Sequence, residues 1–116
     1  MTPRRFLFVV SHAPHRGALA TELLDELLVG AVFEQRVSVL FTDDGVFQLI
    51  DNGQIQGNAA RGYLALPTYD ITDVFVDGRA LKQRGLTEDL LAIPVRVLTR
   101  GAIRKLIARQ DVVVPD

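Results

Sequence analysis

Cysteine is absent from all 116 residues of the chain. Its absence excludes disulfides, thiolate metal ligands and a cysteine nucleophile. It also excludes a persulfide carried by this chain, because no other side chain present can hold and pass on sulfane sulfur.

Histidine is scarce, with His12 and His15 on either side of Pro14. A four-ligand zinc site would need carboxylates from distant loops, so we expect no metal, no cofactor and no catalytic residue, and both rings are better suited to backbone hydrogen bonds or a subunit contact.

An excess of charge of either sign is also lacking, because 13 lysine and arginine residues are balanced by 14 aspartate and glutamate residues. This balance gives no global field to attract nucleic acid, and we expect no direct contact with it. The longest apolar runs, at 6–10 and 37–41, are far shorter than the roughly 20 residues of a membrane span. The first residues lack the apolar length and cleavage site of a signal peptide, which favours a cytoplasmic protein that does not contact membranes.

Apolar residues are abundant, at 48% of the chain, and the mean hydropathy is +0.20. We expect one domain over residues 1–116, because a chain of this length can bury most of its surface in a single core. A small protein with this composition either buries its strands on both faces or hides apolar surface against a partner.

Short apolar runs alternate with segments of helical periodicity. Strands are expected at 5–11, 37–42, 73–76, 95–98 and 111–114. Helices are expected at 17–31, 58–66 and 78–84 and after Thr99, which suits an N-cap, and a short helix is expected to begin within 46–50. The alternation predicts an α/β fold, a three-layer sandwich around a mostly parallel five-stranded sheet of flavodoxin-like type.

In a parallel sheet the functional crevice lies at the carboxyl ends of the strands, which here are followed by residues 12–17, 43–49 and 77–79. The first of these loops reads Ser-His-Ala-Pro-His-Arg-Gly from Ser11. It sits where a dinucleotide fold places phosphate-binding glycines, but it contains neither a G-x-G-x-x-G fingerprint nor a P-loop. A nucleotide site would therefore rest on analogy of fold alone.

Asp43 and Asp44 form the second candidate. Paired carboxylates at the end of a strand can hold a metal, a ribose or a proton. They can also end the strand, with one aspartate capping a following helix and Gly45 permitting a tight backbone. A small-molecule or nucleotide-binding enzyme that uses Asp43, Asp44 and the His12–Gly17 loop is therefore the alternative to a structural role.

A response-regulator receiver, which has the same alternating architecture, fits poorly. Such a domain has an acidic pair after its first strand, whereas the first strand here ends in Ser11-His12. Asp77 matches the phosphoacceptor only superficially, and Lys105 falls within the last helix instead of near the fifth strand.

The acids are followed by a run of apolar residues, Val46, Phe47, Leu49 and Ile50. We expect these residues to form an apolar rim beside the crevice, at a place that should be wet. An apolar rim favours a protein partner over a small polar substrate.

The chain resembles the TusC/DsrF branch of the DsrE/DsrF/DsrH sulfur-relay family over essentially its full length. The likeness rests on segments in a fixed order, of which Asp-Gly-Val-Phe-Gln-Leu is the most specific. These segments are the strand before 11–17, the leucine-rich helix at 23–28, the motif at 44–49, Ala-Arg-Gly-Tyr at 60–63, Tyr-Asp-Ile at 69–71, Ala-Leu-x-x-Arg-Gly-Leu at 80–86 and Asp-Val-Val-Val at 111–114.

The resemblance implies a non-carrier subunit of a cytoplasmic heterohexamer with two copies each of this chain, a TusB-like chain and a TusD-like chain. The TusD-like partner would carry the persulfide and pass it to a downstream acceptor, for 2-thiolation of the wobble uridine of tRNA. In the other branch, a DsrF-like subunit would serve sulfur oxidation. The residues expected at the subunit interface are Asp44, Gly45, Val46, Phe47, Gln48, Leu49, Pro14 and His15.

Overall fold

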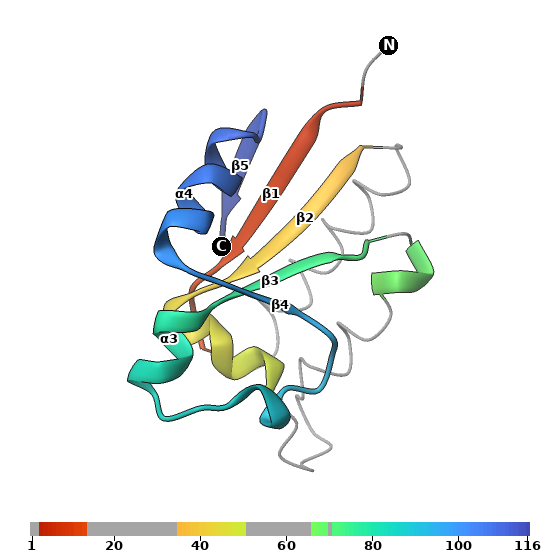
Figure 1. Cartoon of the computed structure of the whole chain (residues 1–116). Helices are drawn as coiled ribbons and strands as arrows, with labels where there is room; N and C mark the ends of the chain where they lie inside the picture. Colours follow the sequence, from red (N-terminus) through yellow and green to blue (C-terminus); the bar gives the residue numbers. More distant parts are fainter. Residues whose placement is uncertain (1–2, 14–34, 51–65, 70) are drawn as a thin grey trace.

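The computed structural model describes residues 3–13, 35–50, 66–69 and 71–116 (Figure 1). The described strands are β1 (Arg5–Val10), β2 (Arg36–Phe41), β3 (Asp73–Asp77), β4 (Arg96–Leu98) and β5 (Val112–Pro115). The α-helices are α3 (Gly78–Gln83) and α4 (Arg100–Ala108), and the 3-10 helices are η1 (Asp43–Leu49), η2 (Leu66–Tyr69) and η3 (Glu88–Leu90). All five expected strands are present, within about a residue at each end. The helices expected at 17–31 and 58–66 lie wholly or almost wholly outside the described residues.

The strands form one sheet in the order β4-β3-β2-β1-β5, and every neighbouring pair is parallel. β1 lies between β2 and β5, so that Phe8 is the register partner of both Val39 and Val114. The first and last strands of the chain are thus neighbours. The expected α/β fold with a parallel five-stranded sheet is confirmed.

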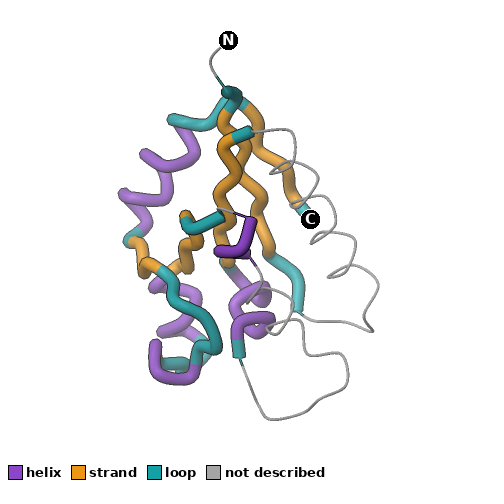
Figure 2. The backbone as a smooth tube through the Cα atoms, turned by 90° about the vertical axis from the view of Figure 1, so that its right-hand side faces the viewer, coloured by secondary structure: helices purple, strands orange, loops and turns teal. Residues whose placement is uncertain are grey.

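Alternate residues of the strands enter two separate cores. On one face, side chains such as Val39 and Phe41 pack with residues of η1, η2 and α3. On the other face, Leu7, Leu40 and Phe75 pack against Ile103 of α4. Figure 2 shows α4 to one side of the strands. The sheet is therefore the middle of three layers, as its runs of apolar residues predict.

Two helix boundaries follow the local sequence. Thr99 is the N-cap of α4, and its hydroxyl accepts a hydrogen bond from the amide of Ala102 at 3.2 Å. Gly85 follows α3 with a φ of 64°, a conformation that glycine adopts without steric cost. Ile107 on α4 is 41% exposed, because the helix meets the sheet through Ile103 and Leu106. Within the described residues, no helix is long and apolar enough to cross a membrane.

Candidate functional site

The strand order reverses beside β1, because β2 lies on one side of it and β5 on the other. Ser11 and His12 follow β1 at this point, and Asp116 follows β5. The carboxylate of Asp116 accepts hydrogen bonds from the amides of Ser11 and His12, both at 3.1 Å, and from the Ser11 hydroxyl at 2.8 Å. Its Oδ1 atom also lies 3.0 Å from Nδ1 of His12, whose ring is largely exposed. Asp116 therefore fixes the backbone of the loop at its start.

Burial by itself would raise the pKa of Asp116, but the hydrogen bonds from Ser11 and His12 outweigh it and lower the pKa from its ordinary value of 3.8. The group is thus an ionised hydrogen-bond acceptor near neutral pH. It does not have the raised pKa that a general acid or base requires.

Asp77, at the end of β3, is completely buried. Its Oδ1 atom accepts hydrogen bonds from the amides of Arg79 and Ala80 at 3.0 and 3.4 Å, which makes it the N-cap of α3. Its Oδ2 atom accepts a hydrogen bond from the Thr42 hydroxyl at 2.8 Å and lies 3.7 Å from Nη1 of Arg100. Both oxygens are therefore occupied within the protein, and the resemblance to a phosphoacceptor does not extend beyond position in the sequence.

Asp43 and Asp44 have different roles. Asp43 is exposed and has a φ of 47°, in the left-handed region that aspartate tolerates better than most residues. Oδ1 of Asp44 accepts hydrogen bonds from Nε and Nη2 of Arg84 at 3.1 and 2.9 Å, which joins η1 to the end of α3 (Figure 1, where η1 is yellow). Neither aspartate caps η1, since the N-cap position is held by Thr42, whose hydroxyl is bonded elsewhere.

A metal site at these acids has no support in the described part of the chain. There, no three histidine, aspartate or glutamate residues are grouped so that they could hold an ion. One of the two carboxylates is instead neutralised by an arginine.

Gly45 and Gln48 hold η1 against the end of β1. A Cβ atom added at Gly45 would lie 1.9 Å from the carbonyl oxygen of Val10, so that only glycine fits. The buried amide of Gln48 donates a hydrogen bond from Nε2 to the carbonyl oxygen of His12 at 2.8 Å. Neither contact was foreseen from the sequence, because both join residues more than 30 positions apart.

The expected apolar rim at 46–50 is much smaller than the sequence indicated. Val46 and Leu49 are fully buried, whereas Phe47 is 38% exposed. The cause is the 3-10 geometry of η1, in which residues three apart share a face, so that Val46 and Leu49 both point into the core. Ile50 is half-buried and forms an isolated bridge with Leu91. Pro14 and His15, the other residues expected at the interface, lie outside the described residues.

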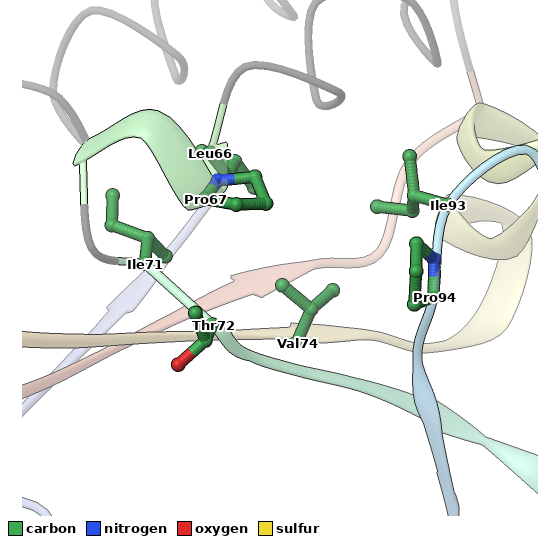
Figure 3. Close-up of a pocket in the computed structure, with 7 residues that line it drawn as sticks. All are labelled: Leu66, Pro67, Ile71, Thr72, Val74, Ile93 and Pro94. Atoms are coloured by element: carbon green, nitrogen blue, oxygen red, sulfur yellow. The ribbon is translucent and has the colours of Figure 1, made fainter.

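A separate pocket of about 230 Å³ lies on the face of the sheet that carries η2 (Figure 3). Figure 3 shows Leu66 and Pro67 on one side, Ile93 and Pro94 on the other, and Val74 of β3 between them. The remaining lining residues are Ile71 and Thr72. Among the described residues that line the pocket, the hydroxyl of Thr72 is the one polar side-chain group, so this part of the pocket suits an apolar group and offers nothing for acid-base or nucleophilic chemistry.

Comparison with known proteins identifies the family of this chain. The model of the DsrE/DsrF-like family matches residues 4–115. A protein named TusC homolog from Pseudomonas aeruginosa is 37% identical over 93% of this chain and 94% of its own length. Protein TusC of Buchnera aphidicola is 32% identical over 96% and 98%, respectively. The intracellular sulfur oxidation protein DsrF of Allochromatium vinosum is 38% identical over 74% of this chain and 66% of its own length.

A solved structure agrees on the fold. The ychN protein from E. coli superimposes with a TM-score of 0.82 over 97% of this chain and 99% of its own, at 17% identity. The sequence likeness, the family match and the arrangement of the sheet all lead to one assignment. The chain belongs to the DsrE/DsrF-like family.

Proposed function

We propose that this chain is a non-carrier subunit of a cytoplasmic sulfur-relay complex, in which a TusD-like partner holds the persulfide and a TusB-like chain completes a heterohexamer. The proposal is supported by relatives named TusC that match nearly the whole chain. It is also supported by the absence of cysteine, since sulfane sulfur passes between thiolates.

The single structural observation that carries the partner role is the exposure of Phe47. Every other residue of the Asp-Gly-Val-Phe-Gln-Leu motif has a task within the described structure. Asp44 binds Arg84, Gly45 fits under Val10, Gln48 holds His12, and Val46 and Leu49 fill the core. Phe47 is the member of the motif that presents a large apolar side chain to the outside, at 38% exposure. An exposed aromatic side chain on a helix whose neighbouring residues are held in the core is typical of an interface anchor.

The other polar residues described at the carboxyl ends of the strands are held in place by contacts within the chain. Their polar groups are occupied by one another, so that Asp44, Asp77 and Asp116 all accept hydrogen bonds from within the chain. This arrangement supports positioning of a neighbouring subunit and leaves the chemistry to the partner's thiolate. Sulfur oxidation is the alternative pathway for the same type of subunit, suggested by the DsrF relative.

Co-expression with TusB-like and TusD-like chains from the same genome tests the proposal. We expect one assembly by size-exclusion chromatography and native mass spectrometry, with all three chains present. Loading the assembly with sulfur from a cysteine desulfurase should add sulfur to the TusD-like chain and none to this one, as measured on the separated chains. Recovery of this chain as a monomer, with no partner bound, would refute the role.

A further inference from the structure

A second pocket, also of about 230 Å³, lies between α4 and the amino-terminal part of the sheet, at the end opposite to the site described above. Four arginines line it: Arg5, Arg36, Arg96 and Arg109. We call it the arginine pocket. Arg5 and Arg36 begin β1 and β2 and are direct register partners, Arg96 begins β4, and Arg109 follows α4. Each comes from a different element, so the cluster exists only in the folded chain.

The strand residues share one face by alternation. Arg5 precedes Leu7 by two positions and Arg36 precedes Leu40 by four, and both leucines pack on the α4 side of the sheet. The ring of Phe75, which packs on that side as well, lies 5.9 Å from the guanidinium carbon of Arg96. This cation–π contact holds one of the four guanidinium groups in place.

Carboxylates compensate the charge of the arginine pocket only in part, and one of them, Asp111, accepts a hydrogen bond through Oδ2 from the main-chain amide of Arg5 at 2.7 Å. Over the described ranges, the ion pairs join His12 to Asp116, Arg84 to Asp44 and Arg100 to Asp77, and none involves the four pocket arginines. One carboxylate, that of Asp73, also lines the pocket. Arg5 and Arg36 lie directly opposite one another on neighbouring strands. Like charges in this arrangement are destabilising. Such a cluster is therefore expected to be neutralised by an anionic ligand.

Arginine pairs with phosphate through two parallel hydrogen bonds, and four arginines can neutralise more than one phosphate. The pocket is also wide. Arg36 on β2 and Arg96 on β4 are two strands apart, which corresponds to about 10 Å at the usual spacing of parallel strands. Arginine side chains are long enough to converge across this main-chain spacing, so it is the fourfold charge that favours a ligand with several phosphates along a chain.

The carboxylate of Asp73 favours a phosphate ligand that also carries hydroxyl groups over one that carries only anionic oxygens. An ionised carboxylate accepts hydrogen bonds and donates none, so it would repel a ligand that carries only anionic oxygens. A ligand that carries hydroxyl groups beside its phosphates would satisfy both Asp73 and the arginines. We propose that the arginine pocket binds a ribose phosphate chain, with phosphates on Arg5, Arg36, Arg96 and Arg109 and a ribose hydroxyl on Asp73. The net charge of the chain, at −1, gives no sign of such a site.

Binding is tested with the full-length chain by fluorescence anisotropy, using a labelled single-stranded RNA of mixed sequence and the DNA of the same sequence. We expect RNA to bind more tightly than DNA, with affinity that falls as salt rises. Competition with ADP and with tripolyphosphate identifies the source of the phosphates. Displacement by ADP at low concentration indicates a free ribonucleotide, whereas displacement only by unlabelled RNA indicates an RNA backbone.

Variants locate the site. Arg36→Gln and Arg109→Gln should each weaken RNA binding about tenfold, as expected for one lost charge-assisted hydrogen bond, and should reduce the slope of affinity against salt by about one. Arg104→Gln is the matched control, because Arg104 lies on α4 outside the pocket. Asp73→Asn should reduce the preference for RNA over DNA. Circular dichroism checks that each exposed substitution leaves the fold intact.

Three results would overturn the proposal. The first is the absence of binding of every phosphate probe at low salt. The second is an equal loss in Arg104→Gln, which would mean that the attraction is diffuse. The third is equal affinity for a poly-glutamate peptide through the same arginines, which would assign the pocket to an acidic protein surface. None of these measurements depends on partner subunits, so their failure is separate from failure of the proposed function.

Discussion

The side chain of Gln48 donates a hydrogen bond to the main-chain carbonyl of His12 across 2.8 Å, and by this contact the 3-10 helix η1 fixes the loop that follows β1. Gln48 is 5% exposed, so the bond is shielded from water. The two segments at the carboxyl end of the sheet are thus one rigid unit. Phe47, beside Gln48 on η1, is held on that unit and points outward.

Phe47 is expected to act in assembly more than in folding. Replacing Phe47 with Asp should lower the free energy of unfolding by about 1–2 kcal/mol, because the side chain is 38% exposed and only its buried part is lost. In the assembly the same change would place a charge in a buried contact and should prevent incorporation. Co-purification with tagged TusB-like and TusD-like chains measures the effect.

The control for Phe47 is Ile107→Asp, on α4, where a large apolar residue is exposed to a similar extent. This variant should still assemble if the effect is specific to η1. Normal assembly of Phe47→Asp would disprove the anchoring role.

Gly45 is expected to tolerate no side chain. Gly45→Ala should destabilise the protein by about 3 kcal/mol or more, because the added Cβ meets the main chain at Val10, which can give way only by moving β1. Urea unfolding followed by circular dichroism measures the loss. In Gly101→Ala, the matched control within α4, the added Cβ has no neighbour within 4 Å, and the change should stabilise by up to about 1 kcal/mol. Equal effects at the two positions would contradict the close approach of η1 to β1.

Asp77 is expected to be structural. Asp77→Ala removes the N-cap of α3 and leaves the Thr42 hydroxyl without its acceptor, which together should cost about 2–4 kcal/mol. Asp77→Asn retains an oxygen that can cap the helix and should cost clearly less. A fully stable Asp77→Ala variant would mean that the buried carboxylate is not needed for folding.

The stabilisation that the carboxylate of Asp116 provides is expected to be lost in acid. Burial opposes ionisation, but the hydrogen bonds from Ser11 and His12 leave the pKa in the folded chain below the value of 3.8 expected when unfolded. The stabilisation is therefore complete well above pH 3.8 and is lost as the pH falls through the folded-state pKa. Asp116→Asn should be less stable than the wild type near neutral pH, and the difference should shrink below about pH 4. Urea midpoints across this range test the sign, and a difference that stays constant would show that the carboxylate charge has no part in the contact.

Much of the fold could be predicted from local sequence. The run of β1 is apolar on both sides from Phe6 to Val10 and that of β2 is interrupted only by Ser38, which identifies strands covered on both faces. Thr99 and Gly85 mark helix boundaries through their own conformational preferences, and the N-cap predicted at Thr99 is confirmed. The candidate site was predictable only in position. Its location follows from the carboxyl ends of parallel strands, but the partners of Asp44, Gln48 and Asp116 lie 36 to 105 residues away and have no local signal.

The sequence by itself determined that this chain carries no persulfide, because the chemistry needs a thiolate and cysteine is absent. It also determined the α/β architecture, since hydrophobic periodicity is a local property. Only the tertiary structure decided that Val46 and Leu49 belong to the core while Phe47 faces outward, because this depends on the three-residue period of η1. Likewise, only folding gathers Arg5, Arg36, Arg96 and Arg109 around one pocket. Charges spread over the chain cancel in the total, but electrostatic attraction depends on their separation in space.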